Sequence, residues 1–125
     1  MTPSSVDKLL SELMSHRTMR ERPWGFMRAL NAPKANLTVK YLFVANGERT
    51  SLQYHKHKDE LLFIINGSGF VEVGDERYEG AGLPVRIKPG VVHRVTGPLV
   101  YLEVSSCDDG TDTIRLSDDY GRTVG

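Results

Sequence analysis

The chain has 125 residues, a length that fits one compact domain with its own hydrophobic core. Its 16 basic and 16 acidic side chains give a formal net charge of zero, which argues against general electrostatic binding to nucleic acid or to an anionic membrane. The single cysteine, Cys107, excludes an internal disulfide. The N-terminus has neither the apolar core of a signal peptide nor a transmembrane run, so we expect a soluble, cytoplasmic protein.

The N-terminal part, residues 1–21, is predicted to form a helix and a linker. Ser4 and Asp7 have the spacing of a capping box at the start of this helix. Apolar residues at helical spacing form one stripe over residues 4–16, namely Val6, Leu9, Leu10, Leu13 and Met14. Pro23 and Gly25 then break helical structure, and we expect Trp24 to anchor this basic linker by packing on the domain.

The remainder, residues 22–125, is predicted to form one all-β domain with a polar C-terminal tail. Short runs rich in Val, Ile, Tyr and Phe alternate with turn sequences such as Asn-Gly and Pro-Gly. The predicted strands cover residues 38–45, 50–57, 60–66, 69–73, 76–80, 83–88, 91–96 and 99–105. Many short strands joined by tight turns are typical of a small antiparallel barrel or sandwich.

Side chains that bind metals or transfer protons are concentrated in residues 51–60, which read SLQYHKHKDE. Because alternate side chains of a strand point to one face, we expect Gln53, His55 and His57 to share a face. Glu60 opens the next predicted strand, and His93 follows a Pro-Gly turn. Two imidazoles, a carboxylate and an amide oxygen suit a divalent metal. Each residue taken singly is more often an exposed polar side chain, so only the joint spacing favours a site.

That spacing resembles the cupin family. The first motif reads Gly47, five residues, Gln53-x-His55, four residues, Glu60, six residues, Gly67, and the second reads Gly82, five residues, Lys88-x-Gly90, two residues, His93. Cupins have the same spacing, with a histidine where this chain has Gln53 and a proline where it has Lys88. The resemblance implies a double-stranded β-helix, or jelly-roll barrel, with a divalent metal ion (Zn, Mn, Fe, Ni or Co). Its implied ligands are Gln53, His55, Glu60 and His93.

Longer stretches are similar to the cupin domain of the type II mannose-6-phosphate isomerases, which also occurs as the C-terminal domain of mannose-1-phosphate guanylyltransferase/isomerases. The similar text is RPWG at 22–25, SLQYHKHKDELLFIING at 51–67, IKPGVVHR at 87–94 and TDTIRLSDDYGR at 111–122. The resemblance implies a sugar-phosphate aldose-ketose isomerase. Such a reaction needs a metal that polarises the carbonyl group, a base that moves a proton between C1 and C2, and cations that hold the phosphate.

The sequence offers candidate residues for these roles. His57 is the candidate base, although a histidine at the rim of the barrel is an equally good interpretation. The anionic group of the substrate has four candidate partners, Lys40, Lys58, Arg94 and Arg122. Lys40 and Arg122 match residues of that family, and they are therefore also candidate catalytic residues.

Four departures from the isomerase text keep other functions open. Lys56, Lys58, Leu61 and Leu62 stand where that family has histidine, arginine, histidine and tryptophan, and lysine cannot copy the planar fork of arginine. One alternative is a non-catalytic metal-containing cupin that binds a sugar or another small molecule. Another is a cupin dioxygenase or epimerase. Open sheet edges also predict a homodimer.

Overall fold

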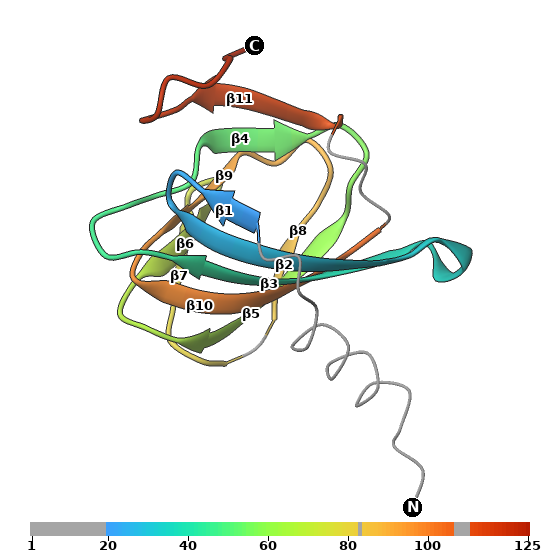
Figure 1. Cartoon of the computed structure of the whole chain (residues 1–125), viewed down its shortest axis with the longest axis horizontal. Coiled ribbons are helices and arrows are strands. Elements are labelled where there is room, and N and C mark those ends of the chain that lie inside the picture. Colours follow the sequence, from blue (N-terminus) through green and yellow to red (C-terminus); the bar gives the residue numbers. More distant parts are fainter. Residues whose placement is uncertain (1–19, 83, 107–110) are drawn as a thin grey trace, which may run out of the picture.

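The structure is a computed structural model that describes residues 20–82, 84–106 and 111–125. It consists of two antiparallel sheets that face each other (Figure 1). The six-stranded sheet contains, in spatial order, β1 (Arg20–Arg22), β2 (Gly25–Ala32), β3 (Leu37–Val44), β10 (Leu99–Ser105), β5 (Glu60–Asn66) and β8 (Val85–Ile87). The five-stranded sheet contains β11 (Thr113–Ser117), β4 (Leu52–His55), β9 (His93–Thr96), β6 (Phe70–Val73) and β7 (Glu76–Glu79). A short 3-10 helix, η1 (Pro33–Ala35), joins β2 to β3. The all-β class is therefore confirmed, and the predicted N-terminal helix lies outside the described residues.

Alternating side chains of both sheets form the core between them. In β10 every second residue is buried, as expected for a strand with one face toward the interior. The core contains Trp24, Met27, Leu42, Val44, Leu62, Val71, Val85, Ile87, Val95, Leu99 and Tyr101. The expectation that Trp24 packs on the domain is thus confirmed.

The eight predicted strands correspond to β3 through β10, but three further strands were not predicted. β1 and β2 form a hairpin in which Arg22 is opposite Gly25, and β2 then pairs with β3 along its whole length. β2 contains Arg, Asn and Ala, which have weak strand preference, so its conformation depends on this pairing. The segment from Arg20 to Trp24 is therefore an edge of the six-stranded sheet and not only a linker.

The C-terminal tail is also more ordered than its polar composition indicated. β11 pairs with β4, with Thr113 opposite His55 and Arg115 opposite Gln53. Beyond β11, Asp119 forms a bidentate ion pair with Arg49 at 2.6 and 3.0 Å. This tail thereby completes the five-stranded sheet at the edge next to the metal-ligand candidates.

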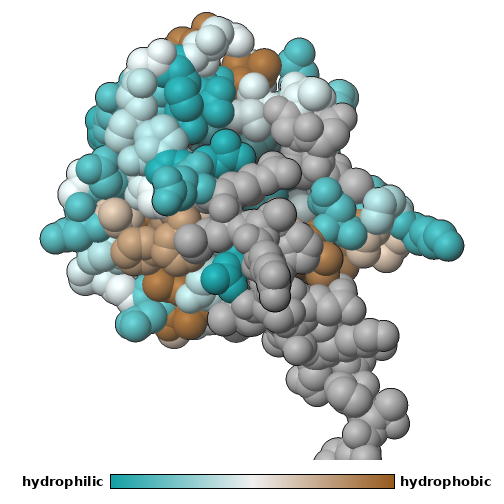
Figure 2. Space-filling view, viewed as in Figure 1, coloured by the Kyte–Doolittle hydropathy of each residue, from teal (hydrophilic) through white to brown (hydrophobic). Residues whose placement is uncertain are grey.

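The outer face of the six-stranded sheet is apolar. Tyr41, Leu102 and Phe63 lie side by side on β3, β10 and β5, and Val39, Val104 and Leu61 form a parallel row. In Figure 2, hydrophobic residues gather over the strands of this sheet. No helix in the described part of the chain has the length and apolar character needed to cross a membrane.

Candidate metal centre

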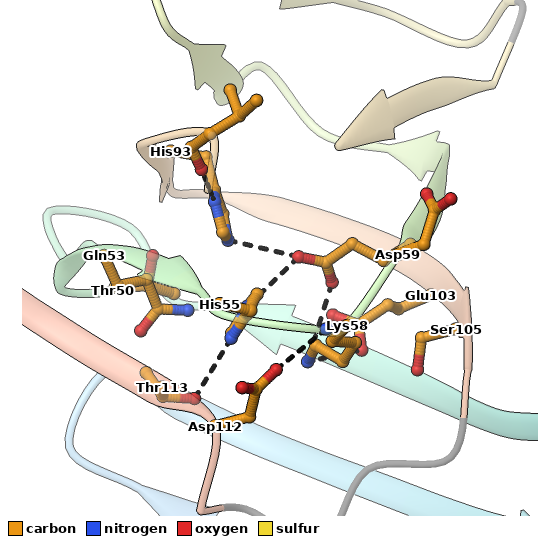
Figure 3. Close-up of polar contacts among 12 residues, drawn as sticks. Thr50, Gln53, His55, Lys58, Asp59, His93, Glu103, Ser105, Asp112 and Thr113 are labelled. Atoms are coloured by element: carbon orange, nitrogen blue, oxygen red, sulfur yellow. Dashed lines mark hydrogen bonds and ion pairs between the residues drawn. The ribbon is translucent and has the colours of Figure 1, made fainter. Parts of the chain in front are cut away.

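Three of the predicted metal ligands meet between the two sheets. His55 ends β4, Glu60 begins β5 and His93 begins β9, and their side chains are 3%, 2% and 5% exposed. Their ligand atoms all lie within 4.8 Å of one another. Both imidazole Nε2 atoms are 3.2 Å from the same oxygen, Glu60 Oε1 (Figure 3). Residues from three strands therefore present their donor atoms to one point.

In each imidazole ring, Nδ1 has a hydrogen-bond partner on the side away from Glu60, and this partner affects whether Nε2 carries a proton. His93 Nδ1 lies 3.0 Å from the carbonyl oxygen of Val91, which only accepts, so Nδ1 carries the proton. In the neutral ring, Nε2 then presents a lone pair to Glu60. His55 Nδ1 lies 3.2 Å from Thr113 Oγ1, a hydroxyl group that can either accept or donate a hydrogen bond. Glu60 Oε1 is buried and has no hydrogen-bond partner among the described residues. A buried carboxylate oxygen that faces two ring nitrogens needs either a proton from one of the rings or a bound cation.

The geometry and protonation of the three residues fit a divalent metal. Zinc lies about 2.1 Å from nitrogen and oxygen ligands, which places neighbouring ligands about 3.0–3.4 Å apart in octahedral or tetrahedral geometry. Burial lowers the pKa of His55, which keeps the ring neutral. Burial opposes ionisation of Glu60, but the imidazoles and Lys58 outweigh it and lower its pKa well below the usual value. A neutral imidazole and an ionised carboxylate are the forms that bind metals.

A turn from the second motif fixes His55 and His93 relative to each other. The N–H of Gly90 donates to the carbonyl oxygen of His55 at 2.7 Å, and Val91 N–H donates to Lys88 O at 3.2 Å. Gly90 has a φ of +82°, which glycine adopts without the steric cost of a side chain. This turn also orients the Val91 carbonyl group that holds the His93 ring. The spacing of the second motif thus has a direct structural role.

Gln53, the fourth predicted ligand, lies on the same face of β4 as His55, as expected. It is directly opposite His93 across the β4–β9 pair. Its amide oxygen accepts a hydrogen bond from Ser51 Oγ at 2.6 Å. The ligand role of Gln53 stays a prediction because that oxygen already has a partner.

The candidate centre lies in a cavity of about 240 Å³. Its wall includes five cationic side chains, Arg22, Lys40, Lys58, Arg115 and Arg122, and two carboxylates, Glu60 and Glu103. The whole chain has no net charge, so positive charge is concentrated here. Such a wall attracts an anionic ligand.

Glu103 is a residue of this cavity that the sequence did not single out. It points inward from β10, with Oε2 3.5 Å from Lys58 Nζ and 3.7 Å from Lys40 Nζ. Burial, together with the charge of Glu60, raises the pKa of Glu103 to about 7. Its inward position could have been read from the alternation of residues 99–105, but no motif pointed to it.

Lys40, Lys58 and Arg122 line the cavity as the sequence predicted. Lys58 is buried, and its Nζ is 3.7 Å from Glu60 Oε2. Arg122 is held by Asp118, with Nη2 to Oδ1 at 2.8 Å and Nε to Oδ2 at 3.1 Å. These three cations therefore form part of the wall that surrounds the candidate metal centre.

His57 does not share the face of His55, and this prediction was wrong. β4 ends at His55, and His57 is exposed and not part of the cavity wall. The backbone N–H groups of His57 and Lys58 both donate to the carboxylate of Asp112, at 2.8 Å for the shorter contact in each case. These hydrogen bonds hold the backbone in a turn after β4. In this turn the Lys58 side chain is buried and the His57 side chain is exposed to solvent.

Arg94, a predicted partner of the anionic group, lies on the opposite face of β9 from His93. It is buried, and its Nε donates to the carbonyl oxygen of Thr50 at 3.0 Å. Burial lowers the pKa of its guanidinium group. Arg94 therefore belongs to the packing beside Thr50 and does not line the cavity.

Comparisons with known proteins identify the family to which this chain belongs. A family model described as the C-terminal part of mannose-6-phosphate isomerase matches residues 10–118. The chain belongs to this family. Within the family match lie His55, Glu60 and His93, and so do all but one of the cavity cations, since Arg122 follows its end.

Curated relatives of this isomerase-type domain are longer proteins. The xanthan biosynthesis protein XanB of Xanthomonas campestris pv. campestris is 31% identical, over 90% of this chain and 25% of the relative. A mannose-1-phosphate guanylyltransferase of Escherichia coli is 31% identical, over 86% of this chain and 24% of the relative. The chain thus spans about a quarter of the length of these relatives.

Solved structures show that the fold is that of cupins. A cupin-2 domain from Rhodospirillum rubrum has a TM-score of 0.59 at 20% identity, over 66% of this chain and 60% of that chain. Oxalate decarboxylase from Bacillus subtilis has a TM-score of 0.68 at 21% identity, over 82% of this chain and 30% of that chain. At this identity the likeness concerns the fold alone.

Proposed function

We propose that this chain is a metal-dependent isomerase that interconverts an aldose and a ketose carrying a phosphate group. The observation that supports it most is the convergence of His55, Glu60 and His93 inside a cavity whose wall is rich in cations. The family description names an isomerase of a sugar phosphate. The relative from Escherichia coli is named for nucleotidyl transfer, but the chain covers only 24% of it, so that activity is not proposed here.

His55, Glu60 and His93 would hold the metal ion, with Gln53 as a fourth ligand if its amide turns away from Ser51. A divalent ion bound there would act as a Lewis acid toward an oxygen atom of the sugar. Thr113 and the Val91 carbonyl group keep the imidazole rings oriented. The Nε2 atom of each ring faces Glu60 and would be the ligand atom for the metal.

Glu103 replaces His57 as the proposed base. Among the described residues, it is the one carboxylate or imidazole side chain of the cavity wall outside the proposed ligand set. Glu103 would take the proton from C2 of the aldose, the electrons of that C–H bond would form the C1–C2 double bond, and O1 would take the proton of the O2 hydroxyl group. The protonated Glu103 would then return its proton to C1 as the C2–O2 carbonyl group forms, which yields the ketose and restores the carboxylate. Lys40 and Lys58, both within 3.7 Å of Glu103, would stabilise its ionised form.

The proposal is tested by metal content and turnover measured on the same preparation. We expect about one metal ion per chain by elemental analysis and interconversion of an aldose phosphate and its ketose phosphate in a coupled assay. Metal content without turnover across a panel of aldose phosphates would refute the isomerase and favour a non-catalytic sugar-binding cupin. Substrate-dependent oxygen consumption would instead indicate an oxygenase.

A further inference from the structure

Arg115 lines the cavity, but it has no part in the metal centre or in the proton transfer proposed above. It lies on β11 directly opposite Gln53 on β4, and paired residues of adjacent antiparallel strands point to the same face. Arg115 therefore points into the cavity, whose wall it helps to form. Its Nε is buried and has no hydrogen-bond partner among the described residues. A buried N–H group without an acceptor is costly, and a ligand oxygen would satisfy it.

Two other arginines line the same cavity. Arg22 comes from β1, the edge strand of the six-stranded sheet, and Arg122 from the tail that follows β11. Asp118 holds the Arg122 guanidinium in place through two contacts, at 2.8 and 3.1 Å. Guanidinium groups present a planar fork of donors that matches the oxygens of phosphate. Strands or segments from both sheets thus contribute arginines to the cavity wall.

The strand order separates this arginine from the candidate metal centre. Arg115, Gln53 and His93 occupy one row across β11, β4 and β9. Neighbouring strands are about 4.8 Å apart, so the backbone of Arg115 is about 10 Å from that of His93. We infer a ligand that places an anionic group at Arg115 and another oxygen atom at the metal centre. A hexose phosphate has this form.

We propose that Arg115 binds the anionic group of the substrate and thereby determines a preference for phosphorylated over free sugars. This inference rests on the proposed function, because it assumes that the reacting end of the sugar lies at the metal centre. Arg122 and Arg22 line the same cavity and add to its positive charge. Arg115 of the proposed subsite comes from β11, whereas the candidate metal ligands come from β4, β5 and β9.

The test is calorimetric binding of a hexose 6-phosphate, and of the matching free hexose, to the metal-loaded full-length chain. Arg115→Gln is expected to weaken binding of the phosphorylated sugar about 10- to 100-fold, the range for loss of a hydrogen bond to a charged group. Binding of the free hexose and the metal content should not change. Arg115→Lys should recover part of the affinity, because it restores the charge but not the fork.

The matched control is Arg77→Gln on β7, at the opposite edge of the same sheet, where Arg77 pairs with Glu79 at 2.6 Å. This variant should bind both sugars like the wild type. Equal affinity of Arg115→Gln and wild type for the phosphorylated sugar overturns the inference, and so does a wild type that binds both sugars equally. If Arg115→Gln does not fold, undiminished affinity in Arg115→Lys overturns it. Binding that depends on Arg115 without any turnover refutes the isomerase but supports the subsite.

Discussion

Replacing Glu60 by glutamine should remove most of the stabilisation of the protein by metal. Glu60 is the one anionic member of the cluster, and its Oε1 lies 3.2 Å from both imidazole Nε2 atoms. Glu60→Gln keeps the shape of the side chain but removes the charge that the ion needs. Loss of a supporting residue around a metal typically weakens binding about 10- to 100-fold, so loss of this ligand should weaken it by at least about 100-fold.

The size of the effect on stability follows from mass action. At a free metal concentration about 100 times the Kd, binding stabilises the folded wild type by about 2.7 kcal/mol. For a domain of this length that corresponds to a rise in Tm of about 10 °C. In Glu60→Gln the same concentration is close to the Kd, so the stabilisation falls to about 0.4 kcal/mol and the rise in Tm to about 2 °C.

The assay is a thermal unfolding scan with added metal and with chelator, together with elemental analysis of the purified protein. Because each variant is compared with itself, a general change in its stability does not affect the result. Glu103→Gln is the matched control, since Glu103 is a buried carboxylate of the same cavity that also contacts Lys58. It should keep the metal response and lose turnover. A Glu60→Gln protein that retains one metal ion per chain and the full rise in Tm would refute the proposed centre.

Three further predictions concern the surroundings of the centre. Thr113→Val removes the partner of His55 Nδ1 and should lower metal affinity about 10-fold in a competition titration with a chelating dye, and unchanged affinity would contradict the role of Thr113. The hydrogen bond from Arg122 lowers the pKa of Asp118 below 3.8, so this ion pair stabilises the fold above that pH and is lost as the pH falls further. Asp118→Asn should therefore lose less stability between pH 7 and pH 3 than the wild type in urea unfolding, and equal losses would argue against the pair. The apolar row that contains Phe63 predicts a homodimer by light scattering and a monomer for Phe63→Lys, whereas a monomeric wild type would remove the dimer hypothesis.

The metal centre could be anticipated from the sequence because its geometry follows local rules. Gln53 and His55 share a face of β4 by strand alternation, and Glu60 begins the next strand after a short turn. The Pro-Gly turn before His93 is visible in the sequence, and its Gly90 binds the backbone of His55 at 2.7 Å. Motif spacing therefore carried most of the information about this centre.

The wrong predictions depended on contacts between distant parts of the chain. His57 leaves the face of His55 because Asp112, 55 residues later, binds its backbone. Arg94 faces away from the cavity because His93 faces into it, and no local pattern indicates which of two adjacent strand residues points inward when both are buried. β11 was missed for a related reason, since its polar sequence forms a strand only where β4 offers an edge.

Four residues differ from the residues typical of the isomerases, and their consequences differ because their side chains point to different sides of the domain. Lys56 is exposed, and Leu61 is on the outer face of the six-stranded sheet opposite Val104, so neither contributes to the cavity wall. Lys58 and Leu62 do line the cavity. Lys58 keeps a positive charge beside Glu60 and Glu103, and Leu62 makes that part of the wall apolar. The departures thus leave the candidate ligands His55, Glu60 and His93 in place and change the surface that a sugar would contact. We therefore expect differences from other family members in substrate recognition more than in metal binding.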